Sequence, residues 1–154
     1  MNFNMRFGVV LAAASLFIAT PVFAETAEEI ADELNEAFFQ YNWEEFGNKA
    51  GDYFSRDKRF KTDFVALGKK AALSAKSIEA MGSYVSHTVV RTDVCGDRIK
   101  RIVTVVFAED GQYYVSYWFT KAEAVWSLSN FSFNGQGSTA KFFEKLSEQL
   151  KISC

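Results

Sequence analysis

The chain has 154 residues, of which 17 are lysine or arginine and 19 are aspartate or glutamate, giving a formal net charge of −2. This acidic balance argues against nucleic acid as a partner, because binding to a phosphate backbone needs an excess of positive charge. The length is that of one ordinary domain and is enough to bury a hydrophobic core.

Residues 1–24 have the three-part build of a secretory signal peptide. Arg6 adds positive charge near the amino terminus, an apolar run covers residues 7–18, and a polar turn precedes the small-x-small end at Ala24. The run is too short to be a stable membrane span. We expect cleavage after Ala24, a single mature domain of residues 25–154 with net charge −3, and a periplasmic or secreted location. No cysteine stands at the cleavage point and no later run is long enough to span a bilayer, so we expect a soluble protein without an anchor after processing.

Two amphipathic helices are predicted at the start of the mature chain. Thr26 and Glu29 form a capping box, and apolar residues then recur at helical spacing as far as Tyr41. Asn42 offers the next cap, with Glu45 three residues later, so a second helix should follow a sharp bend.

The next segment is less regular. A third, modest helix is predicted over Thr62–Leu67, with Gly68 to Lys70 ending it. Residues 71–81 are rich in alanine but fit either a helix or an extended segment, and helix is favoured.

The pattern changes to β structure at Gly82. β-Branched and aromatic residues dominate, interrupted by turn signals, which is typical of an antiparallel meander. The four predicted strands are Tyr84–Val94, Arg98–Ala108, Gln112–Thr120 and Val125–Phe133.

Both faces of this sheet are apolar in the sequence. In the second strand Val103, Val105 and Phe107 oppose Ile102, Thr104 and Val106, and in the third Tyr114 and Trp118 oppose Tyr113, Val115, Tyr117 and Phe119. Each face must therefore be covered, by helices, a second copy or a ligand. Gly135 to Gly137 breaks the chain, and a last amphipathic helix is predicted after Ser138 or Thr139, either closing a pocket mouth or lying on the other face.

Cys95 and Cys154 are the only cysteines. In an oxidising compartment an intramolecular disulfide is the natural prediction, and closing a loop of about 60 residues would stabilise the fold by roughly 4 kcal/mol. The alternative is that each is a free or intermolecular thiol, since Cys154 ends the chain and Cys95 falls in a predicted turn.

Helices followed by a curved meander whose last strand carries Trp126 and alternating hydrophobics to Phe131 resemble the NTF2-like superfamily, especially its small secreted bacterial families of unknown function. Leu67-Gly68-Lys69 and the tyrosine-rich hairpin with Tyr113, Tyr114 and Tyr117 add to the likeness, which spans about residues 26–134. The resemblance implies an α+β fold of NTF2-like or cystatin-like type, with the C-terminal helix as an extra element. It also implies a cone-shaped cavity between helices and sheet and a possible homodimer through the outer sheet face.

Function does not follow from that fold, because the superfamily includes isomerases, dehydratases, transport factors and inert domains. An isomerase or hydrolyase would need an acid or base in the cavity. His87, the only histidine, and Asp63 are weak candidates; Asp93 should share a face with His87, and Tyr84 should lie opposite.

Other chemistry lacks a motif. One histidine and two distant cysteines do not make a zinc site, and no phosphate loop or nucleophile motif occurs, so no metal or cofactor is predicted. Basic residues near the first hairpin (Arg91, Arg98, Lys100, Arg101) and at Arg56, Lys58, Arg59 and Lys61 are interpreted as solvated surface. The leading hypothesis is a non-catalytic exported protein that binds a small apolar ligand or a protein partner through its pocket or sheet face.

Overall fold

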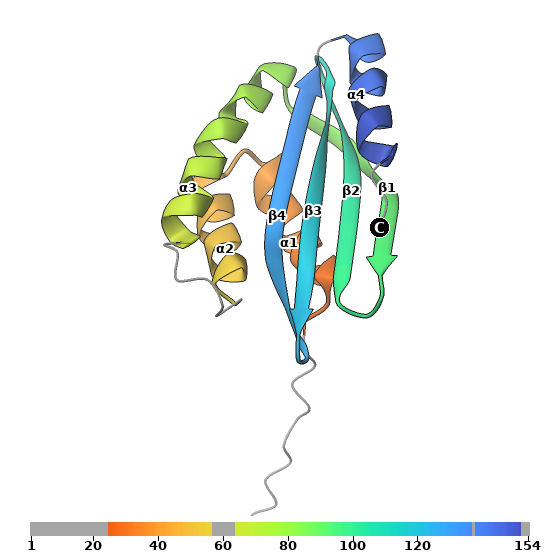
Figure 1. The fold of residues 1–154 in the computed structure, drawn as a ribbon. Helices are drawn as coiled ribbons and strands as arrows, with labels where there is room; N and C mark the ends of the chain where they lie inside the picture. The colour runs from red at the N-terminus through yellow and green to blue at the C-terminus, as the bar shows by residue number, and fades with distance from the viewer. Residues whose placement is uncertain (1–24, 57–63, 137, 152–154) are drawn as a thin grey trace, which may run out of the picture.

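The computed structural model describes residues 25–56, 64–136 and 138–151. Its helices are α1 (Ala27–Phe39), α2 (Trp43–Ser55), α3 (Phe64–Ala75), the short 3₁₀ helix η1 (Lys76–Met81) and α4 (Thr139–Lys151). Its strands are β1 (Tyr84–Cys95), β2 (Ile99–Ala108), β3 (Gln112–Ala122) and β4 (Val125–Gln136). The strands form one antiparallel sheet in the order β1-β2-β3-β4, and the predicted α+β architecture is confirmed (Figure 1). The proposed signal segment and its cleavage site lie outside the described residues, and none of the described helices is long and apolar enough to cross a membrane.

The first two helices begin at the predicted caps. The Thr26 side chain accepts a hydrogen bond from the backbone of Glu29, and the Glu29 carboxylate accepts one from the Thr26 backbone at 2.7 Å. Asn42 likewise accepts from the backbone of Glu45. The helical pattern does not extend to Tyr41, because this residue has a φ of +56° and makes the sharp bend between α1 and α2.

Gly68 does not end α3, contrary to the sequence prediction. The helix continues through it to Ala75 and passes into η1. An added Cβ at Gly68 would lie 2.1 Å from the carbonyl oxygen of Gly47 in α2, so the glycine allows the two helix backbones to approach closely. The residue is therefore a packing feature rather than a stop signal.

The predicted alternation of β2 and β3 is confirmed, and each face contributes to its own core. The face towards α1, α2 and η1 carries the larger core, which includes Ile102, Val106, Tyr113, Val115, Tyr117, Phe119 and Leu128 of the sheet. The opposite face carries a smaller core of Val103, Val105 and Tyr114. The strand ends differ slightly from the prediction, since Gly135 pairs with Tyr113 inside β4 instead of breaking the strand.

The position of α4 decides between the two predicted alternatives. Its buried residues Phe142 and Leu146 pack on the smaller core, so the helix lies on the sheet face opposite the first three helices (Figure 1). It does not close a mouth on the helical side. Phe143 on the same helix remains 57% exposed, which shows that α4 is not covered by the rest of the described chain.

Candidate functional site

His87 lies at the surface on β1. Its Nδ1 atom is 2.8 Å from the hydroxyl of Tyr84, and its ring is 4.9 Å from the ring of Phe39 at the end of α1. The rings of Tyr84 and Phe39 are stacked at 5.0 Å. The histidine thus sits in a small surface cluster of aromatic rings, where solvent competes for any proton that it would transfer.

Two bulges in β1 overturn the predicted sharing of faces around His87. The pairing with β2 shifts between Tyr84 and Ser86 and again between Val89 and Arg91. Each extra residue changes which way the following side chains point. Tyr84 therefore lies on the same side as His87, and Asp93 lies on the α4 side with Arg101. The other weak candidate, Asp63, lies outside the described residues.

Aromatic side chains occupy the described space between helices and sheet. Phe38, Phe46, Tyr113, Tyr117 and Phe119 are fully buried there. Phe38 touches Phe46 edge-on at 5.0 Å and Tyr113 at 5.9 Å. The hydroxyl of Tyr117 donates to Oδ1 of Asn35 at 3.0 Å, and burial raises the pKa of this phenol well above its ordinary value. These residues supply packing area and one neutral hydrogen bond.

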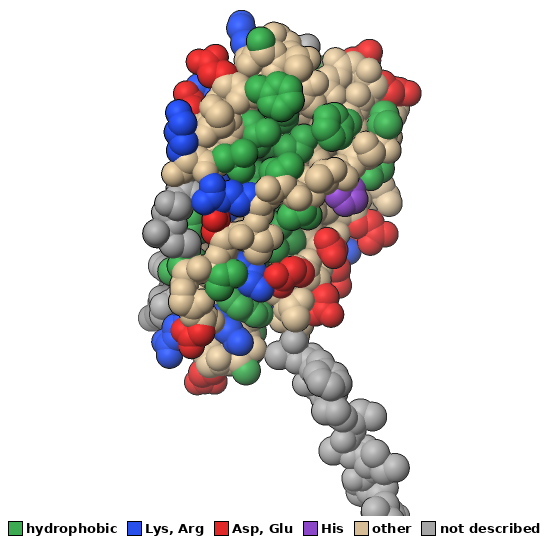
Figure 2. Space-filling model, turned by 90° about the vertical axis from the view of Figure 1, so that its right-hand side faces the viewer, with side chains coloured by type: hydrophobic (Ala, Val, Ile, Leu, Met, Phe, Trp, Pro, Cys, Tyr) green, Lys and Arg blue, Asp and Glu red, His purple; other side chains and the backbone are tan. Residues whose placement is uncertain are grey.

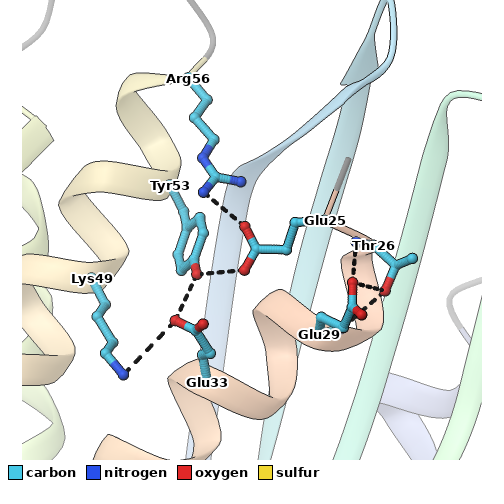
Figure 3. Close-up of polar contacts among 7 residues, drawn as sticks. All are labelled: Glu25, Thr26, Glu29, Glu33, Lys49, Tyr53 and Arg56. Atoms are coloured by element: carbon cyan, nitrogen blue, oxygen red, sulfur yellow. Dashed lines mark hydrogen bonds and ion pairs between the residues drawn. The ribbon is translucent and has the colours of Figure 1, made fainter. Parts of the chain in front are cut away.

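A polar cluster joins α1 to α2 near the start of the described chain (Figure 3). The hydroxyl of Tyr53 lies 3.0 Å from Glu25 and 2.8 Å from Glu33. Arg56 is 2.8 Å from Glu25, and Lys49 is 3.8 Å from Glu33. Because burial and the two carboxylates disfavour the phenolate, the pKa of Tyr53 is raised strongly. No sequence motif marks this cluster, since its members come from different elements.

The acidic side of this cluster is open. Glu25, Glu29, Asp32 and Glu33 line a surface hollow beside α1. Within the described residues, no group of three or more histidine, cysteine or acidic side chains is arranged to hold a metal ion. The two cationic partners instead make the cluster a charge-compensated contact between helices.

Arg101 corrects the prediction of a solvated basic surface at the first hairpin. Its side chain is fully buried, and it donates to Oγ of Ser116 at 3.1 Å and to the backbone carbonyl of Gln149 at 2.9 Å. Asp93 lies 3.7 Å away, and the ring of Trp118 lies 5.1 Å from the guanidinium carbon. Burial lowers the pKa of Arg101, while Asp93 opposes that shift. The arginine is buried because α4 covers this end of the sheet.

Arg91 makes a second contact to the same helix end. It donates to Asp93 at 2.6 Å and to the carbonyl oxygen of Leu150. Both arginines thus satisfy carbonyl groups in the last turn of α4, where the helix dipole favours positive charge. In the second basic run only Arg56 is described, and it pairs with Glu25. Lys58, Arg59 and Lys61 lie outside the described residues.

Most of the exposed large apolar side chains belong to β1, β2 and α4. We call these eight residues, which follow the β1 edge and lie partly on the α1 side and partly on the α4 side of the sheet, the apolar face: Tyr84, Val85, Val89, Val90, Val94, Ile99, Phe107 and Phe143. Their exposed fractions range from 39% to 61%. Figure 2 shows hydrophobic side chains gathered over the upper half of this side of the molecule, with charged groups mainly around them. The sequence indicated a doubly apolar sheet but not which part α4 would leave open.

Cys95 is the last residue of β1 and is partly buried, and Cys154 lies outside the described residues. The contact of Arg91 with Leu150 brings the last described turn of α4 beside β1, four residues before Cys95. The predicted Cys95–Cys154 bond is compatible with this arrangement and stays a prediction.

Comparison with known proteins identifies the fold. No protein-family model matches the chain, and no curated protein matches it by sequence. A Campylobacter jejuni protein named as an NTF2-like transpeptidase superposes with a TM-score of 0.52 at 11% identity, covering 68% of this chain and 97% of that one. A Nostoc punctiforme domain of unknown function with a cystatin-like fold gives a TM-score of 0.45 at 11% identity, covering 81% of this chain and 83% of that one. By its likeness to the Campylobacter protein the chain is an α+β protein of NTF2-like fold, and the predicted resemblance holds at the level of fold.

Proposed function

We propose that this chain is an exported, non-catalytic binding protein that engages a protein partner through the apolar face. The observation that carries the proposal is the uneven placement of apolar side chains. Large rings fill the described interior, whereas Phe107 of β2 and Phe143 of α4 remain 44% and 57% exposed. Monomeric soluble proteins rarely keep large contiguous apolar patches without a use for them.

A protein partner fits this face better than a small apolar ligand. Small ligands bind in concave sites that enclose most of their surface. The apolar face instead consists of one edge strand, its neighbour and the exposed side of a helix, and the described interior beneath is occupied by Phe38, Tyr113 and Tyr117. Aromatic residues presented on a broad surface are typical anchors of protein interfaces.

The alternative function, a cofactor-free isomerase or hydrolyase using His87, is not favoured by the geometry. His87 is exposed, its ring nitrogen contacts Tyr84, and the acid predicted beside it points to the other face. A general base that acts on a carbon acid needs a site from which water is excluded.

Site-specific photo-cross-linking in cells that export the protein tests the proposal. A photoreactive phenylalanine analogue would replace Phe107 or Phe143, and the matched control would replace Leu73, which is 65% exposed on α3. We expect both positions on the apolar face to give an adduct of the same defined mass, and position 73 to give none. Absence of adducts from the apolar face, or identical adducts from position 73, would contradict the proposal.

A further inference from the structure

We infer that β1 pairs through its outer edge with β1 of a second copy of this chain, about a two-fold axis beside Thr92. The inference deepens the proposed function and rests on it, because it names one occupant for the part of the apolar face near Val94, at the end of β1. The starting observation is that hydrogen-bonded strand pairing reaches β1 from one side only within the described residues. An edge strand with unpaired backbone groups is a template for another strand.

The two edges of the sheet are treated differently by the fold. The β4 edge lies beside the helices, because β4 packs against α2 and η1 (Figure 1). None of the 12 residues of β1 is buried, and Val94 is 60% exposed. Proteins usually block an open edge with proline, charged side chains or bulges. The sequence of β1 contains neither proline nor lysine, and its Arg91 and Asp93 are paired with each other at 2.6 Å.

Bulges protect only the first part of β1. Both irregularities occur before Arg91, whereas residues 91–95 pair with residues 99–103 of β2 without a break. This short regular segment has the geometry that a further strand requires. Its own side chains include an exposed Thr92 and Val94 and the charged pair Arg91 and Asp93.

The charges of Arg91 and Asp93 favour a second copy of this chain as the partner strand, and they favour one alignment of the two strands. In an antiparallel pair, side chains that lie directly opposite each other point to the same side of the sheet. When the two strands are identical and related by a two-fold axis, this requires the axis to pass beside one residue. That residue then lies opposite the same residue of the second copy. An axis at Arg91 or Asp93 would set like charges opposite each other, which is unfavourable. An axis at Thr92 sets Arg91 opposite Asp93 of the second copy on both sides of the axis. Since Arg91 and Asp93 already lie 2.6 Å apart, the four groups would alternate in sign.

Charge swapping at the axis provides the test. Thr92 is exposed and faces its own copy only in the inferred dimer. We therefore expect the wild type to sediment as a dimer, and Thr92→Lys and Thr92→Asp each to sediment as a monomer. Mixing the two variants should restore dimers that contain one copy of each. Restoration of the dimer also shows that both variants are folded. Thr88→Lys, on the bulged part of β1, is the matched control and should remain dimeric.

Three results would overturn the inference: a wild type that remains monomeric at every concentration reached, a dimer that survives Thr92→Lys, or a mixture that fails to associate while both variants unfold cooperatively. These results differ from failure of the proposed function. A monomer that still cross-links from Phe107 and Phe143 to another protein would remove only the second copy as the occupant.

Discussion

At the scale of single residues, Arg101 shows how this fold holds its extra helix. It is a fully buried cation whose partners come from β1, β3 and the last turn of α4. Removing one member of a buried charged network leaves the other groups without compensation, which costs more than the network contributes overall.

We expect Arg101→Met to lower the free energy of unfolding by about 3 kcal/mol. The variant retains apolar volume but leaves the Ser116 hydroxyl and the Gln149 carbonyl without their donor and removes a positive charge from beside Asp93. Urea unfolding measures the change. Arg98→Met on the same hairpin is the matched control, because the Arg98 side chain is 78% exposed, and it should change stability by less than about 0.5 kcal/mol. Equal effects of the two substitutions would contradict the buried role.

The tyrosines give a pH prediction. Desolvation raises the pKa of Tyr41, Tyr53, Tyr113, Tyr114 and Tyr117, most strongly in the interior. Because the folded state holds the phenol proton more tightly than the unfolded state does, ionisation of these tyrosines opposes folding. The free energy of unfolding is therefore unaffected below the unfolded-state pKa of about 10 and falls as pH rises above it. Alkaline titration followed by tyrosinate absorbance should show delayed ionisation that coincides with unfolding. Titration of these five tyrosines near pH 10 in folded protein would contradict the expected shifts.

At the scale of elements, the close crossing of α2 and α3 depends on glycine. Helix propensity alone predicts that Gly68→Ala stabilises α3 by about 1 kcal/mol. The structure predicts the opposite sign, a loss of about 2 kcal/mol, because the new methyl group would meet the Gly47 carbonyl oxygen at 2.1 Å. Gly47→Ala, whose Cβ would have neighbours at 3.3 Å, should cost less in thermal or urea unfolding. A stabilised Gly68→Ala protein would show that the helices do not cross closely there.

The elements of this fold follow from local sequence signals, whereas several of their contacts do not. The caps at Thr26 and Asn42 and the alternation in β2 and β3 are local signals, so they could be identified from spacing. Gly68 resembles a helix end in sequence, and only the neighbouring helix shows that it serves close packing. The bulges in β1 leave no mark in the residue pattern, which is why the faces of Asp93 and Tyr84 were predicted wrongly. Arg101 was assigned to the surface because the cover by α4 is a tertiary property.

At the scale of the whole molecule, the predicted Cys95–Cys154 bond would tie the chain end to the sheet beside the α4 contacts of Arg91 and Arg101. Mass measurement of the protein as isolated from cells should show a species lighter than its reduced form by two hydrogen atoms. Reduction should lower the free energy of unfolding by up to about 4 kcal/mol in the chain-entropy model. Free thiols are blocked first, and the protein is then reduced and its mass measured again. If both cysteines carry the blocking group before reduction, and the mass does not change on reduction, the bond is absent.

Binding of a protein partner at the apolar face predicts a native complex whose mass depends on Phe107 and Phe143. Exported wild-type protein and the double variant Phe107→Ser/Phe143→Ser would be compared by native mass measurement, with Leu73→Ser as the control for removal of an exposed apolar side chain. The wild type and Leu73→Ser should occur in a complex that contains a second protein, whereas the folded double variant should have lost that protein and be no larger than the dimer through β1, which these substitutions do not alter. Identical masses for the wild type and the double variant would contradict binding at this face.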